Sequence, residues 1–232
     1  MSTLAPPESS ADIRSGVTHF LFRRLHSLTG IIFGGYVVVH LLINATLLQG
    51  GTGATDIYQL QVDKIHSLPW LVVIEWTFIY LPIIFHTLYG ISIIFTGRPN
   101  TNRYGYGKNY FYVAQRVSAI VLVLFLLFHV LGMKGLLGSA FTFDPHLATQ
   151  TTVRHITANA FVAYVVYPIG ILAGTFHLAN GFWTAAITWG LTVSRRAQQR
   201  WGAACVGLFV ITFLAGMGAW AAAIAKGGVS VQ

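Results

Sequence analysis

The chain has 232 residues, of which 55% are apolar and only 9% carry a charge. A typical soluble domain carries about 25% charged residues, so this composition excludes an ordinary soluble enzyme. It is also the opposite of the composition of a disordered chain. The single cysteine, Cys205, excludes an internal disulfide and a metal site built on paired cysteines. The net charge of +8 raises the question of a nucleic-acid partner, which the positions of the charges address below.

Five apolar stretches each supply the roughly 20 residues that a membrane-spanning helix needs. We expect spans at residues 25–47, 69–96, 112–137, 157–193 and 202–225, the fourth of which is long enough to tilt. Their richness in Leu, Ile, Val and Phe disfavours the alternating pattern of a membrane barrel. The predicted fold is an all-α membrane protein whose single transmembrane domain covers residues 21–227.

Polar segments flank these spans. Residues 1–20 are expected to form a loose tail without a cleaved signal peptide, and residues 228–232 a short second tail. Strong breakers at residues 98–100 and 144–145 separate neighbouring spans. Ten Lys and Arg fall in the first tail and the even loops, against four in the odd loops and at the C-terminal end. Basic residues accumulate in cytoplasmic loops, so we expect a cytoplasmic N-terminus, an external C-terminus and no nucleic-acid partner.

One histidine lies deep in each of the first four spans: His40, His86, His129 and His177. Ionisable side chains at such depth are costly and usually functional. At 1.5 Å per residue, His40 and His129 lie about 25 Å from the cytoplasmic edge. By the same measure His86 and His177 lie about 25–30 Å from the outer edge. The spacing therefore predicts two pairs, His40 with His129 towards the outside and His86 with His177 towards the cytoplasm.

Two neutral imidazoles that face each other across a helix bundle can bind a haem iron from both sides. A zinc ion would need further ligands, and the sequence offers no Cys or acid at either depth. The alternative is that each histidine bonds a neighbouring helix, which suits one lone histidine better than four matched in depth. Gly30, Gly34 and Gly90 would leave room for a flat ligand, although close helix packing explains them equally. Pro82 and Pro168 are expected to kink their helices.

Several short motifs follow one another between about residues 20 and 200. They are FRRLHSL at 22–28, HLLIN at 40–44, SLP at 67–69, LPIIFHTLYG at 81–90, QRV at 115–117, FH at 176–177, NG at 180–181 and TWG at 188–190. In this order, with the histidines in register, they resemble the cytochrome b membrane anchors of succinate:quinone oxidoreductases, in the form with five helices and two b haems.

The resemblance implies a distal haem on His40 and His129 and a proximal haem on His86 and His177. It also implies a flavoprotein subunit and an iron–sulfur subunit docked on the cytoplasmic face of a bacterial cytoplasmic membrane. Quinone, usually menaquinone in similar anchors, would react near the distal haem. The implied role is electron transfer between the iron–sulfur subunit and quinone, as a subunit of a succinate dehydrogenase or fumarate reductase with no succinate chemistry of its own.

Further polar residues are candidates for this site. Haem propionates need donors, and Arg24, His26, Ser27 and Arg116 lie at the cytoplasmic ends of the first and third spans. Anchoring at the membrane edge is the alternative for the two arginines, and an interfacial position for His26. Glu75, the only acid within a span, is expected about 9 Å inside the outer edge. It is a candidate to exchange protons with quinone, and a carboxylate that snorkels to the interface is its alternative.

The remaining histidines, His19, His66, His146 and His155, are expected to be solvated or interfacial. Two other functions fit the general pattern. One is a dihaem cytochrome b anchor of another respiratory oxidoreductase, such as a hydrogenase, which co-purifying subunits would distinguish. The other is a transporter that relays protons through buried histidines. Such a transporter would be expected to have inverted repeats and acids at the midplane, and neither is clear in this sequence.

Overall fold

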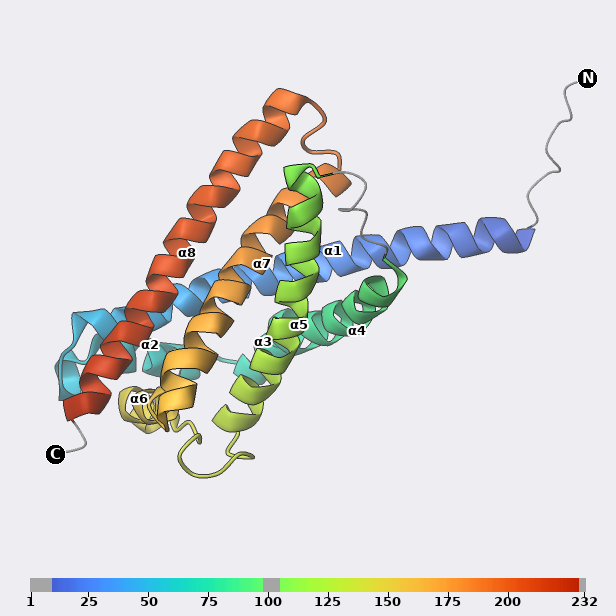
Figure 1. The fold of residues 1–232 in the computed structure, drawn as a ribbon. Coiled ribbons are helices and arrows are strands. Elements are labelled where there is room, and N and C mark those ends of the chain that lie inside the picture. The colour runs from blue at the N-terminus through green and yellow to red at the C-terminus, as the bar shows by residue number, and fades with distance from the viewer. Residues whose placement is uncertain (1–9, 98–104, 230–232) are drawn as a thin grey trace, which may run out of the picture.

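The computed structural model describes residues 10–97 and 105–229. The breaker at residues 98–100, the basic residue Arg103 and both chain ends beyond these ranges lie outside the described part. The described residues form helices and their connections, without a strand. Five helices are long and apolar enough to cross a membrane (Figure 1). The predicted all-α fold with five spans is therefore confirmed.

The chain order of the elements follows the five predicted spans. The long segments are α1 (Ser10–Ala45), α3, η3 and α4 (Leu71–Glu75, Trp76–Tyr80, Leu81–Thr96), α5 (Gly107–Met133), η5 and α7 (Val162–Val166, Tyr167–Thr188) and α8 (Arg195–Val229). The short connecting helices are η1 (Thr46–Gln49), η2 (Gly53–Thr55), α2 (Ile57–His66), η4 (Pro145–Leu147) and α6 (Ala148–Ile156). Because α1 begins at Ser10, residues 10–20 are helical, where a loose tail was expected.

Two long helices end earlier than the expected residues 137 and 193, and a glycine ends each of them. Gly135 and Gly190 adopt left-handed backbone with φ of 76° and 72°, a conformation that costs glycine little. Beyond Gly190, the amide of Leu191 donates to the carbonyl of Ala186 at 2.9 Å, which closes the end of α7. The apolar residues that follow each glycine therefore belong to loops, although hydropathy alone assigns them to the spans.

Two π-turns, η3 and η5, widen the second and fourth spans just before Pro82 and Pro168. Proline has no amide hydrogen and its ring crowds the carbonyl four residues earlier, so the α-helical bond is lost there. In η5 the amide of Tyr167 instead donates five residues back, to Val162. The expected local distortion at both prolines thus takes the form of a π-turn, a feature that often occurs at functional sites.

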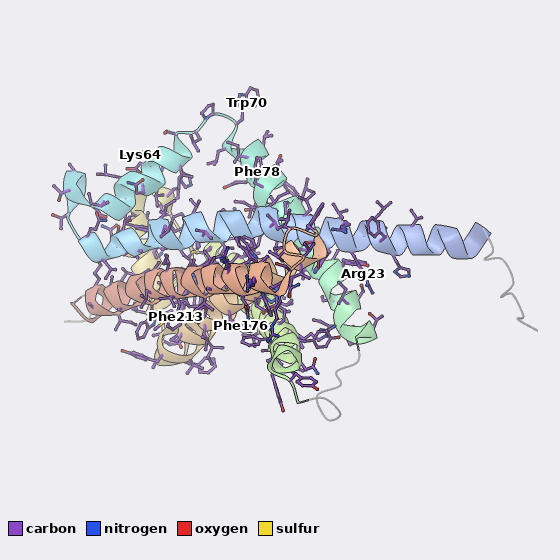
Figure 2. All side chains as sticks on the ribbon, turned by 90° about the horizontal axis from the view of Figure 1, so that it is seen from above. Arg23, Lys64, Trp70, Phe78, Phe176 and Phe213 are labelled. Atoms are coloured by element: carbon purple, nitrogen blue, oxygen red, sulfur yellow. The ribbon has the colours of Figure 1, made fainter. Side chains whose placement is uncertain are left out.

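The long helices pack as two pairs with α8 alongside. α1 packs on α4 and α5 packs on α7, whereas α4 and α5 scarcely meet. α8 lies against α7 and α1 (Figure 2), and Trp220 of α8 donates its indole N–H to the carbonyl of Ala163 in η5 at 2.6 Å. The N-terminal part of α1 extends past the other helices (Figures 1 and 2). This arrangement leaves the space between the two pairs to side chains that project from all four helices.

One end of the bundle is covered by α2 and α6, which we call the cap (Figure 1). Apolar side chains of the cap and of the helix ends form a buried cluster of Leu47, Tyr58, Val62, Ala148, Ala219 and Ala222. The small alanines of α8 let the cap approach closely. Gln59 joins the two cap segments, because its amide donates to the carbonyl of Pro145 and accepts from the amide of Ala148, both at 2.7 Å. Burial raises the pKa of Tyr58, whose hydroxyl pairs with that of Thr152.

Candidate functional site

Four histidines from four helices meet as two pairs inside the bundle. The ring centres of His40 on α1 and His129 on α5 are 6.1 Å apart, with an angle of 79° between the rings. Those of His86 on α4 and His177 on α7 are 6.2 Å apart, with an angle of 87°. The first pair lies in the half of the bundle near the cap, and we call it the cap-side pair; the second is the far pair. The structure therefore brings together the same histidines that the depth argument pairs.

The separation within each pair suits a metal ion between the rings. An ion held about 2 Å from each of two imidazole nitrogens places the ring centres about 6 Å apart, since each nitrogen lies about 1 Å from its ring centre. Among the residues that the structure describes, no group of three or more His, Cys, Asp or Glu is placed to hold a metal ion. Two protein ligands are too few for a structural zinc site, but they complete the coordination of a haem iron.

The second ring nitrogen of each histidine supports the same chemistry. Each Nδ1 has a hydrogen-bond partner, namely the hydroxyl of Tyr36 for His40 (3.4 Å), that of Tyr167 for His129 (3.2 Å), the carbonyl of His26 for His86 (3.0 Å) and the hydroxyl of Ser118 for His177 (3.2 Å). None of the four Nε2 atoms makes a hydrogen bond within residues 10–97 and 105–229. Metal-bound histidines usually donate their other N–H in this way, so these contacts leave the Nε2 of each ring available as a ligand.

In the far pair these partners also fix which nitrogen carries the proton. His86 Nδ1 faces a carbonyl, which can only accept, so Nδ1 must be the protonated nitrogen. The hydroxyl of Ser118 donates to the carbonyl of Gln115 at 3.0 Å, and its oxygen is therefore left to accept from His177. Gln115 in turn donates to the carbonyl of His177 at 3.1 Å. In both histidines Nε2 keeps its lone pair for a metal.

Two of the candidate propionate residues carry buried polar atoms without a partner in the described part of the chain. The ring of His26 stacks on that of His86 with centres 4.0 Å apart, and its Nδ1 has no hydrogen bond. The Nε of Arg116 is likewise buried without a partner, and the guanidinium lies 3.5 Å from the ring centre of Tyr112. Buried orphan donors are rare, so both residues have a donor to offer to an anionic ligand.

The other two candidates are engaged elsewhere. The hydroxyl of Ser27 accepts the indole N–H of Trp189 at 3.0 Å. The guanidinium of Arg24 lies over the rings of Phe20 and Trp189, at 5.0 and 4.9 Å from their centres. Both side chains thus anchor the start of the first span to the end of the fourth, at the end of the bundle opposite the cap.

Glu75 ends α3, directly before the π-turn η3, within the second candidate span. Its side chain is partly buried, and η3 packs against α1, the helix that carries His40. Within the described residues the carboxylate makes no hydrogen bond or ion pair. A carboxylate so placed is able to exchange protons with a ligand near the cap-side pair.

His155 differs from expectation. We expected it to be solvated or interfacial, and this is wrong because α6 carries it into the bundle, where its exposed fraction is 0%. Its Nδ1 donates to the carbonyl of Phe141 at 2.7 Å, and its Nε2 is buried without a partner in the described structure. Burial lowers the pKa of His155, which keeps the ring neutral at pH 7. His66 and His146, in contrast, are exposed as expected.

Sequence reasoning missed the residues behind the histidines. Tyr36 precedes His40 by four residues on one helix, a spacing that places the two side chains together and was a usable signal. Ser118 and Tyr167 come from a different helix than the histidine they contact, and nothing in the sequence indicates those contacts. His155 approaches because Gly132 has no side chain, since a Cβ there would lie 2.7 Å from the Cε1 of His155.

A substitution at Gly30 tests the geometry of the far pair. A Cβ at Gly30 would lie 2.6 Å from the Cε1 of His86, so Gly30→Ala must displace this ring. If His86 and His177 bind a haem, the purified variant is expected to lose most of it, as measured by haem content. Gly35→Ala, on the same helix, is the matched control, because nothing lies within 4 Å of its Cβ and Ala favours a helix by about 1 kcal/mol. Equal haem content in the two variants would contradict this reading of the site.

Comparison with known proteins supplies one strong relationship. No family model matches the chain. The succinate dehydrogenase cytochrome b558 subunit of Bacillus subtilis (strain 168) is 34% identical to it over 188 residues. The aligned residues cover 80% of this chain and 87% of that protein. Identity at this level over most of both chains means that they share a family and a fold.

Proposed function

The chain belongs to the family of succinate dehydrogenase cytochrome b subunits, and on this premise we propose that it passes electrons between an iron–sulfur subunit and quinone through two b haems. The observation that carries this proposal is the two histidine pairs, with ring centres 6.1 and 6.2 Å apart and with every Nε2 free of hydrogen bonds to the described residues. Family membership accounts for a membrane-anchoring cytochrome b. The two couples support two haems, each with two histidine ligands.

The chain's own residues would hold and orient each group. His40 and His129 would bind one iron, and His86 and His177 the other. When bound, the two haems would supply one-electron transfer across the bundle. The hydrogen bonds at Nδ1 keep the rings in place, and the apolar surroundings of the four helices exclude water from the site.

The buried donors favour a position of the haem propionates beside His26 and Arg116. We propose that His26 and Arg116 contact the propionates of the haem held by the far pair, because each has a buried nitrogen without a partner among the described residues. Ser27 and Arg24, already engaged by Trp189, would contribute at the edge of the same site. Charge-assisted bonds of this kind are about twice as strong as those between neutral groups.

The placement of charge favours an orientation in the membrane. Arg23 and Arg24 on α1 and Arg195, Arg196 and Arg200 on α8 lie at the end of the bundle opposite the cap. We propose that this end faces the cytoplasm of a bacterial cell, where the iron–sulfur subunit docks and a flavoprotein subunit completes the complex. The cap would then face outward, and quinone, in our proposal menaquinone, would react near the cap-side pair and Glu75.

Purification of the complex from its native membrane tests the proposal. We expect a flavoprotein and an iron–sulfur subunit to co-purify, and two b haems per chain with bis-histidine spectra that titrate separately. A fully assembled protein without a bis-histidine haem would refute the proposal and leave a histidine-relay transporter as the alternative. Co-purification with hydrogenase subunits would instead identify the chain as the anchor of a different oxidoreductase.

A further inference from the structure

The two histidine pairs differ in the groups behind them. In the far pair the Nδ1 atoms face a backbone carbonyl and a serine hydroxyl, whereas in the cap-side pair both face phenols. The contact of Tyr167 with His129 is the shorter of the two phenol contacts, 3.2 against 3.4 Å, and Tyr167 is buried. If Nε2 of His129 binds iron, Nδ1 must carry the proton. The phenol oxygen of Tyr167 then accepts, and its own O–H is left to find an acceptor.

A matching acceptor lies in the same cluster. The ring centre of His155 is 5.8 Å from that of Tyr167 and 5.9 Å from that of His129. His155 uses its Nδ1 proton on the carbonyl of Phe141, so its Nε2 bears a lone pair. This atom is buried and has no partner in the described structure. A buried acceptor that lacks a donor in the described structure thus lies in the same ring cluster as the buried hydroxyl of Tyr167, and such an acceptor costs free energy until it is satisfied.

We propose that Tyr167 and His155 are positioning residues that set the electron-donating strength of His129. In the proposed arrangement His129 donates to the oxygen of Tyr167, and the hydroxyl of Tyr167 turns to the lone pair of His155, with which it makes no hydrogen bond in the described structure. An acceptor behind a metal-bound imidazole makes the ring a stronger electron donor, which favours the oxidised metal. The cap helix α6 thereby acts on the cap-side haem although it supplies no ligand. This inference rests on the proposed function.

The test uses the complete complex and measures the midpoint potential of each haem. Tyr167→Phe removes the acceptor for His129, so the potential of the cap-side haem is expected to rise while that of the far haem stays unchanged. A tenfold change in the preference for oxidised over reduced iron corresponds to a shift of about 59 mV. Tyr164→Phe, one helical turn earlier and 60% exposed, is the matched control and should shift neither potential.

Substitutions at His155 test whether this residue affects the potential of the cap-side haem while Tyr167 is left unchanged. His155→Leu removes the acceptor for Tyr167 and is expected to raise the same potential by a smaller amount. His155→Gln keeps an acceptor oxygen as well as a donor for Phe141, and should restore the original potential. His146→Gln, at an exposed position of η4 beside the cap, should change nothing.

A reciprocal variant separates this inference from a general effect on the bundle. Ser118→Ala removes the acceptor behind His177 and should raise only the potential of the far haem. The inference is overturned if Tyr167→Phe leaves both potentials unchanged or moves both by the same amount, or if His155→Leu and His155→Gln behave alike. Absence of haem from the unmodified complex would be a different result, since it would refute the proposed function itself.

Discussion

Replacing His129 with alanine is expected to halve the haem content of the purified complex, from two haems per chain to one. The variant leaves His40 as the only ligand of the cap-side pair, because the neighbouring His155, whose ring centre lies 5.9 Å from that of His129, is held by its own hydrogen bond to the carbonyl of Phe141. His86 and His177 keep their ring separation of 6.2 Å and all their Nδ1 partners, so the far haem should remain. Haem-to-protein ratio and redox titration of the remaining haem measure this outcome.

Two further variants make this result specific. His177→Ala should produce the reciprocal loss, so that the remaining haem has the potential of the cap-side site. His146→Ala changes an exposed histidine of η4, beside the cap, and should leave both haems in place. Retention of two haems by the His129 variant would show that the pairing of ligands is wrong. Loss of both haems from an assembled complex would show that the two sites do not form independently.

The pairing of the histidines was accessible from the sequence because helix geometry is rigid. A rise of 1.5 Å per residue converts the distance from a membrane edge into a depth, and only side chains at the same depth are able to meet. The same reasoning fails for His155, because α6 is a short helix outside the spans. Its position depends on packing against α8, where Ala223 has no exposed surface, and no periodicity encodes that contact.

The spans likewise combine a feature that the sequence predicts, their position, with one that it predicts poorly, their ends. Hydropathy locates five segments correctly because about 20 apolar residues in a row have few other uses in proteins. It overestimates the ends near Gly135 and Gly190, where the chain turns although apolar residues continue. The prolines at positions 82 and 168 predict a distortion of each helix. Whether it becomes a kink or a π-turn depends on which neighbouring groups donate to the backbone carbonyls that lose their helical hydrogen bond. Trp220 on α8 supplies one such group through a contact between distant segments.

Glu75→Gln is expected to lower quinone turnover by about 10²–10⁴-fold, the usual contribution of a positioned acid or base, while both haems and their potentials are retained. Quinone that gains or loses two electrons must also exchange protons, and Glu75 is the only acid in the described parts of the five candidate spans. Glutamine keeps the shape of the side chain and removes only its ability to exchange a proton. Turnover with a soluble quinone and reduction of the haems from the succinate side are measured on the same preparation.

The comparison of these two measurements decides the role of the carboxylate. If electrons still reach the haems from the succinate side and quinone turnover alone is lost, Glu75 acts in proton exchange. Asp63→Asn is the matched control, because Asp63 lies on the exposed side of the cap and its carboxylate accepts from Gln59 at 2.8 Å. Undiminished quinone turnover in Glu75→Gln would mean that the carboxylate only reaches towards the membrane interface. The proton acceptor would then be a group other than a carboxylate of the spans, since within them the described residues offer no second acid.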